Sequence, residues 1–352
     1  MNSRIGDVEA PGVFVKRLES IHIMRGFAAC VVMMCHLTAA NDNINQKLPL
    51  FSSLFSYGDL GIWMFFVISG FVIPFSMKAI DYRFPRGAWP FFLRRIVRLE
   101  PPYVASVLLA YVIAYAAART PGYRGGPFDP DLVTFLTQFI YLAPWFDKPW
   151  INGVAWTLAI EFQYYILMLF VGPLLLSGAK IKLLLFFALV IASSLLVSDQ
   201  RAVFYYLPCF ALGFAAFLYY DRQVDFASFA VLAVIFAALA NYNLGWAPAI
   251  VAVGSAGAIF LPIRKPVPLL SFLGSISYSV YLVHTPVGDR LINLSTRLPN
   301  IGWLQLLGVA VAVGGSVGVS YLLWHYVERP ATQLAKRIST NGITPFKPAE
   351  AD

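Results

Sequence analysis

The amino-acid sequence predicts an all-α membrane protein, a polytopic bundle of about ten transmembrane helices with both termini cytoplasmic. Of the 352 residues, 59% are hydrophobic and only 12% are charged, and the mean hydropathy is +0.69. Soluble domains carry about 25% charged residues, so this composition excludes an ordinary soluble domain. The apolar runs continue over about 20 residues, the length of a spanning helix, whereas the strands of a β-barrel would alternate.

Each apolar run between charged residues or Pro and Gly predicts one span. The spans cover residues 22–40, 58–78, 101–118, 154–176, 181–198, 203–220, 226–241, 247–263, 268–287 and 303–326. Residues 131–142 form a run too short to cross and are expected to lie at the membrane interface. The flanking segments 1–20 and 328–352 are expected to be cytoplasmic, so that residues 21–327 form the transmembrane domain.

The distribution of Lys and Arg sets the predicted orientation. With ten spans and a cytoplasmic N-terminus, 19 of these residues lie on the cytoplasmic side and 7 on the other, in agreement with the positive-inside rule. The same excess explains the net charge of +8 without a nucleic-acid partner. The three cysteines lie in apolar runs and are interpreted as packing residues, and no Cys/His pattern predicts a metal site.

Few ionisable side chains lie inside the predicted spans, where such residues are costly and usually functional or paired. They are His36, Asp59, Glu161, His284 and His325. His325 lies near the end of the last span and is interpreted as a structural residue at a helix terminus. The other four are candidates for a functional site.

Arg25 and His36 lie eleven residues apart in the first span. Eleven steps of about 100° complete three turns and about 20° more, so both side chains face one way, separated by about 16.5 Å along the axis. A cation at the water boundary with an imidazole deep in the membrane suits a ligand with an anionic head and a reactive tail, such as acyl-coenzyme A. The alternative is that Arg25 anchors the helix and His36 is a packing residue.

A basic segment precedes the third span. On a helix, either Arg94 and Arg98 or Arg95 and Arg98 share a face, and paired guanidinium groups bind phosphate well. These residues are therefore expected to bind the same anionic head. Anchoring to lipid phosphates would produce the same pattern.

Two polar stripes complete the candidate site. Their members are Thr157, Glu161 and Tyr165 in the fourth span, and Ser277, Tyr281 and His284 in the ninth. Glu161 is expected to reach a depth similar to that of His36, so that the two side chains can meet. His284 is expected to contact an acceptor or this carboxylate, or else to be structural.

Several motifs occur together and in order between about residues 20 and 330. They are Arg25-x10-His36; the segment from Gly58 to Phe71, which contains Asp59 and Ser69; Arg95-x-x-Arg98 with Pro101 and Tyr103; Trp156-Thr157-Leu158-x-x-Glu161; Ser277-Tyr278-Ser279-Val280-Tyr281-Leu282-x-His284; and Glu328-Arg329-Pro330. In these motifs the chain resembles the acyltransferase-3 family of integral-membrane acyltransferases. Many family members carry a C-terminal hydrolase-like domain, and this chain resembles the stand-alone form.

The resemblance implies transfer of an acyl group, most often acetyl, from cytoplasmic acyl-CoA to a hydroxyl group at the bacterial inner membrane. The implied acceptor is a cell-surface glycan, such as an exopolysaccharide or lipopolysaccharide, or its lipid-linked precursor. The site residues assigned on this basis are His36 and Glu161 for catalysis, Arg25, Ser69, Arg95 and Arg98 for the acyl-CoA donor, and Asp59, Tyr281 and His284 for the acceptor. No metal is implied.

The residues agree with this chemistry, because an imidazole with an ordinary pKa near 6.5 is a suitable base for a hydroxyl that attacks a thioester. Glu161 is expected to fix the tautomer of His36 or to bind the acceptor. Direct transfer and an acyl-histidine intermediate both stay open.

The rival hypothesis is a transporter or flippase with a proton relay through His36 and Glu161. Against it, the sequence does not show the paired Gly/Pro-broken segments that are typical of transporters. A purely structural bundle leaves Arg25 and His36 unexplained.

Overall fold

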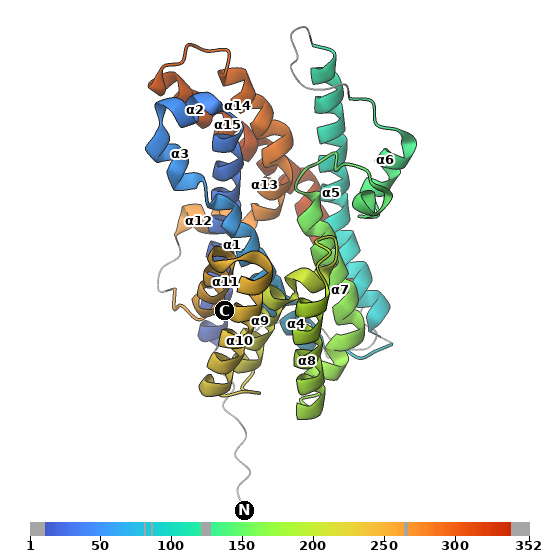
Figure 1. Ribbon diagram of the computed structural model, residues 1–352. Coiled ribbons are helices and arrows are strands. Elements are labelled where there is room, and N and C mark those ends of the chain that lie inside the picture. Colours follow the sequence, from blue (N-terminus) through green and yellow to red (C-terminus); the bar gives the residue numbers. More distant parts are fainter. Residues whose placement is uncertain (1–10, 81, 86, 121–127, 264–266, 339–352) are drawn as a thin grey trace, which may run out of the picture.

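The computed structural model describes residues 11–80, 82–85, 87–120, 128–263 and 267–338, and all regular elements in them are helical (Figure 1). The α-helices are α1 (Pro11–Ala39), α2 (Asp42–Lys47), α3 (Pro49–Phe55), α4 (Gly61–Ala79), α5 (Ala88–Ala118), α6 (Leu132–Gln138), α7 (Ala155–Leu176), α8 (Lys180–Leu196), α9 (Val203–Tyr220), α10 (Phe226–Leu244), α11 (Trp246–Ala258), α12 (Pro268–Ser275), α13 (Ser277–Val283), α14 (Arg290–Ser295), α15 (Gly302–Leu323) and α16 (Arg329–Arg337). The 3₁₀ turns are η1 (Gly58–Leu60) and η2 (Ala143–Phe146), and the π-helical turns are η3 (His284–Asp289) and η4 (Trp324–Glu328).

Within the described residues, seven helical stretches are long and apolar enough to cross a membrane. They are Glu19–Ala39, Pro49–Ala79, Ala88–Ala118, Ala155–Leu176, Val203–Tyr220, Phe226–Leu244 and Gly302–Arg337. The prediction of a polytopic helical membrane protein is therefore confirmed. The three remaining predicted spans are helical but short or broken: α8 has 17 residues, α11 has 13, and the ninth is divided into α12, α13 and a π-helical turn.

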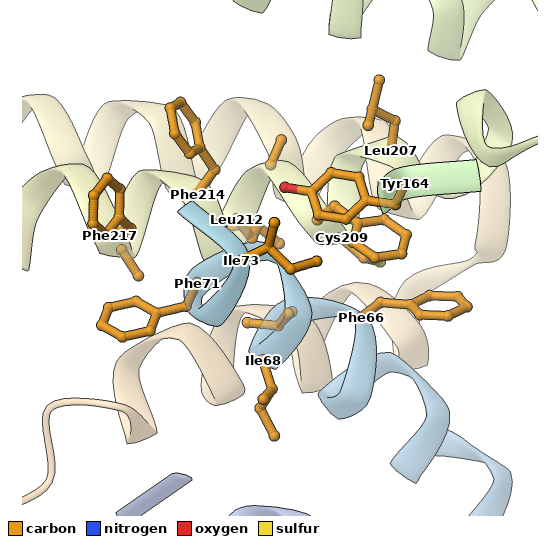
Figure 2. Close-up of a cluster of buried hydrophobic side chains, with 14 of the residues drawn as sticks. Phe66, Ile68, Phe71, Ile73, Tyr164, Leu207, Cys209, Leu212, Phe214 and Phe217 are labelled. Carbon is orange, nitrogen blue, oxygen red and sulfur yellow. The ribbon is translucent and has the colours of Figure 1, made fainter. Parts of the chain in front are cut away.

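Helix α9 forms the centre of the main core, where it packs against α4, α7, α8, α10 and α11. Aromatic and branched side chains of α4, α7 and α9 fill the space between these helices (Figure 2). The backbones of α4 and α9 come very close, because a Cβ atom at Gly70 would lie 2.1 Å from the Phe210 carbonyl oxygen and one at Gly213 would lie 2.0 Å from that of Val67. Such small-residue contacts are typical of helix packing in membranes.

A second close crossing joins α1 to α12. A Cβ atom at Gly274 would lie 2.2 Å from the His22 carbonyl oxygen, and one at Gly26 would lie 2.5 Å from that of Leu270. Helix α1 also packs against α4, α13 and α15. In Figure 1, α2, α3 and α14 lie at the top of the molecule, whereas α8 and α10 lie at the bottom. Helix α1 therefore runs between the end that contains α2, α3 and α14 and the end that contains α8 and α10.

Candidate functional site

Two cavities between the described helices are lined by most of the candidate residues. The first, which we name the arginine cavity, has a volume of about 100 Å³, and its polar lining consists of Arg25, Ser69, Arg95, Arg98, Thr157, Glu161, Tyr165, Ser277, Tyr278 and Tyr281. The second, the histidine cavity, has a volume of about 410 Å³, and its lining includes His36, Trp156, Tyr281, Thr285, Asp289, Arg290 and Asn293. Ile62 and Tyr281 line both cavities, so these two side chains form the boundary between them.

Three guanidinium groups from α1 and α5 line the arginine cavity. Arg95 donates to the hydroxyl of Ser76 at 2.7 Å and lies 5.4 Å from the centre of the Tyr165 ring. Arg25 and Arg98 make no hydrogen bond or ion pair with any residue that the structure describes. Because partly buried cations without partners are costly, this cluster is suited to an anionic ligand.

The structure decides which arginines of α5 share the cavity face. Arg95 and Arg98 line the cavity, whereas the Nε atom of Arg94 donates to the Ile338 carbonyl oxygen at 2.9 Å. Arg94 therefore holds the end of α16 in place. The sequence left two arginine pairs open, and the pair that lines the cavity is Arg95 with Arg98.

Glu161 is held by hydroxyl groups inside the arginine cavity. It accepts a hydrogen bond from Ser69 at 2.7 Å and another from the Tyr165 hydroxyl. Ser69 was assigned to the donor site, and the structure shows its hydroxyl bound to this carboxylate. The expected contact between Glu161 and His36 is not formed, because His36 lines the histidine cavity on the other side of Tyr281.

His36 instead contacts His284. Its Nδ1 atom lies 2.8 Å from Nε2 of His284, and the nearly parallel rings, 14° apart with centres separated by 5.0 Å, fit an edge-to-edge hydrogen bond. The other nitrogen of His284, Nδ1, lies 3.1 Å from the Val280 carbonyl oxygen. A carbonyl can only accept, so Nδ1 of His284 carries a proton, and in a neutral pair its Nε2 accepts from Nδ1–H of His36. This leaves Nε2 of His36 as a basic nitrogen.

Tyr281 is fixed at the boundary between the cavities. Its hydroxyl lies 2.7 Å from that of Thr157, and its ring lies 5.6 Å from that of Phe65, centre to centre. On the neighbouring turn, Asn152 donates to the Leu282 carbonyl oxygen at 2.9 Å and accepts from Thr285 at 3.1 Å. The segment that carries Tyr281 and His284 is thus held in place by side chains from outside it.

Asp59 lies outside the lining of both cavities, whereas Asp289 belongs to the lining of one. Asp59, assigned to the acceptor, is an exposed residue of η1 and lines neither of the two cavities. Asp289, which sequence reasoning missed, lines the histidine cavity. A carboxylate two residues after the end of a predicted span is a signal that could have drawn attention to it.

No group of three or more His, Cys, Asp or Glu side chains in the described part of the chain is arranged to hold a metal ion. The arginine cavity instead offers guanidinium groups, which suit phosphates, and the histidine cavity offers acceptors of hydrogen bonds. The site therefore has one part suited to an anion and another suited to a molecule with hydroxyl groups.

Comparison with known proteins identifies the family of the chain. The O-acetyl transferase of Shigella phage Sf6 is 26% identical over 326 residues, which cover 86% of this chain and 92% of that protein. The acyltransferase MdmB of Streptomyces mycarofaciens is 29% identical over 157 residues, which cover 43% of this chain and only 38% of that protein. No solved structure matches the chain significantly. The sequence profile of the acyltransferase domain matches residues 18–325, and the chain therefore belongs to the acyltransferase-3 family.

Proposed function

We propose that this acyltransferase-family protein transfers an acyl group, in the first instance acetyl, from acyl-CoA to a hydroxyl group of a cell-surface glycan or its lipid-linked precursor. The observation that carries the proposal is the meeting of a cationic cavity and a histidine cavity at Ile62 and Tyr281. A donor in the first cavity and an acceptor in the second would bring the thioester and the hydroxyl together at this boundary. The proposed location is the bacterial inner membrane.

The arginine cavity is the proposed donor site. Arg25, Arg95 and Arg98 present guanidinium groups from two helices, and such groups bind phosphate oxygens in pairs. Arg25 and His36 are separated by about 16.5 Å along α1, which suits a donor whose phosphates lie at one end and whose thioester lies at the other. Glu161 is the proposed counter-charge, because its hydrogen bonds to Ser69 and Tyr165 keep it in the cavity without closing on the guanidinium groups.

His36 is the proposed general base. Its Nε2 atom accepts the proton of the acceptor hydroxyl while the hydroxyl oxygen bonds to the thioester carbonyl carbon. The carbon–sulfur bond then breaks, and the proton passes from His36 to the leaving sulfur, so that the products are the ester and the free thiol of CoA. His284 is the proposed positioning residue, because its hydrogen bond keeps the proton of His36 on Nδ1 and the lone pair on Nε2.

The proposed topology has ten spans with both termini cytoplasmic. Helices α8 and α11 and the segment from α12 to η3 would then cross in addition to the seven long stretches. This arrangement keeps most Lys and Arg residues cytoplasmic. It also places Arg25 on the cytoplasmic side of His36, where acyl-CoA is available.

The function is tested by following acetyl-CoA in purified protein in detergent, with cyclohexane-1,2-diol added as the hydroxyl acceptor and with no membrane gradient. An acyltransferase releases free CoA thiol under these conditions, whereas a transporter does not consume the thioester. We expect His36→Ala to lower the rate by about 10²–10⁴-fold, the usual contribution of a positioned base, while the variant still inserts and purifies normally. Full activity of His36→Ala, or no acetyl-CoA consumption by the wild type, would contradict the proposal.

The donor site has a matched control on the same helix. The double variant Arg95→Ala with Arg98→Ala should raise the KM for acetyl-CoA by at least about tenfold, because each charge-assisted hydrogen bond contributes about 1.5–3 kcal/mol. Arg94→Ala removes one positive charge from the same helix, but this side chain binds the Ile338 carbonyl oxygen and lies outside the cavity lining. An equal rise in KM in the control would show that the effect comes from surface charge alone.

A further inference from the structure

The histidine cavity holds a carboxylate oxygen without a partner. The Oδ1 atom of Asp289 is buried and has no hydrogen-bond partner among the residues that the structure describes, although Arg290 also lines the cavity. A buried acceptor left unpaired costs about 1–3 kcal/mol, and more when it is charged. An unpaired oxygen that faces a cavity of about 410 Å³ therefore points to a ligand that donates a hydrogen bond.

The π-helical turn η3 brings this carboxylate to the same side as the hydrogen-bonded rings of His36 and His284. Asp289 follows His284 by five residues, and in an α-helix five steps of about 100° would turn its side chain about 140° away. A π turn closes with bonds between residues five apart, so His284 and Asp289 become neighbours along one face. His284 binds His36, and Asp289 and His36 line one cavity.

Both groups accept hydrogen bonds from a ligand in this cavity. In the tautomer derived above, Nε2 of His36 accepts the proton of the reacting hydroxyl, and Asp289 can accept a second hydroxyl proton. We infer that Asp289 binds a second hydroxyl group of the acceptor, so that the histidine cavity selects acceptors with two neighbouring hydroxyls over those with one. This inference rests on the proposed acyl transfer and adds to it the chemical feature that the acceptor must carry.

The ring of Trp156, which also lines the cavity, supports an acceptor built on a ring. Aromatic faces pack against the apolar faces of saturated rings, while the polar groups of the ligand are directed to hydrogen-bond partners at its edge. Asn293, from the first turn of α14, lines the cavity as well and offers both a donor and an acceptor. The cavity is thus suited to a cyclic molecule with several hydroxyl groups.

The test uses acetyl-CoA with two small probes, cyclohexane-1,2-diol and cyclohexanol, which differ in one hydroxyl group. We expect the wild type to acetylate the diol with a kcat/KM about 10- to 100-fold higher than that for the single alcohol, the effect of one hydrogen bond to a carboxylate. Asp289→Asn and Asp289→Ala should remove most of this preference, so that the ratio of kcat/KM for the diol to kcat/KM for cyclohexanol falls toward one. Asp129→Asn, a change of an exposed carboxylate in the 119–131 region, is the matched control and should keep the preference.

The possible outcomes separate the two proposals. Acetylation of both probes without a preference, or a preference that survives in both Asp289 variants, would overturn the role of Asp289 while acyl transfer stands. Consumption of acetyl-CoA with transfer to neither probe would also overturn it. A wild-type protein that leaves acetyl-CoA intact would instead overturn the proposed function, and the inference with it.

Discussion

The hydrogen bond between His36 and His284 gives the sharpest test of the proposed base. Replacing His284 with phenylalanine keeps a flat ring in a fully buried position but removes the acceptor at 2.8 Å from Nδ1 of His36. The proton of the neutral His36 imidazole can then lie on either Nδ1 or Nε2. Whenever it moves to Nε2, the nitrogen needed as the base is blocked.

The expected size of the effect follows from the cost of a buried donor without a partner. That cost is about 1–3 kcal/mol, which corresponds to a decrease in kcat of about 5- to 150-fold. The KM for acetyl-CoA should change little, because the guanidinium groups line the other cavity. Because a loss of folded protein also lowers the apparent kcat at an unchanged KM, the decrease points to a positioning role of His284 only when the variant is folded to the same extent as the wild type.

A conservative variant provides the control. In His284→Gln the amide oxygen lies at about the reach of the lost Nε2 atom and can accept from His36, so this variant should recover most of the kcat that His284→Phe loses. Steady-state kinetics with acetyl-CoA and thermal unfolding in detergent are measured on both. A kcat of His284→Phe equal to that of the wild type, or equal losses in two well-folded variants, would refute the tautomer argument.

Two further predictions concern stability. Gly70→Ala should lower the melting temperature in detergent markedly, because the new Cβ atom would lie 2.1 Å from the Phe210 carbonyl oxygen and overpacking costs about 1–3 kcal/mol; Gly254→Ala, which meets nothing within 4 Å, should not. The hydrogen bond from Lys148 and the cap of α6 hold the pKa of Asp131 well below its ordinary value. This contribution is complete above about pH 4 and is lost as the pH falls through the lowered pKa. The protection of the α6 amides from hydrogen exchange, relative to the intrinsic rate at each pH, should therefore fall on acidification, and Asp131→Asn should abolish that pH dependence.

Features that depend on the geometry of one helix could be predicted from the sequence. The spacing of Arg25 and His36 places both on the inward side of α1, and each lines a cavity. The sequence also limited the inward arginines of α5 to two pairings, one of which the structure shows. Helical periodicity suffices for such inferences, because it relates residues on one element without any knowledge of its neighbours.

Features that depend on contacts between helices could not be predicted in the same way. The sequence paired His36 with Glu161 by their similar depth, but depth does not show that Tyr281 lies between them. Likewise, the sequence treated the residues after His284 as an ordinary helix end. Because a π turn replaces it, Asp289 faces inward, and no period of about 3.6 residues could indicate that.

Tyr281 lies at the boundary between the two cavities, a position that the polar stripe in the sequence does not indicate. It lines both cavities and is held by Thr157, so under the proposed function every acyl group passes this side chain or Ile62. A donor held by cations on one side and an acceptor held by His36 on the other need never share a compartment. Only the thioester and the reacting hydroxyl must reach the boundary, and the CoA head and the bulk of the acceptor stay on opposite sides. The division of the interior into two cavities is therefore as important to the proposed reaction as the base itself.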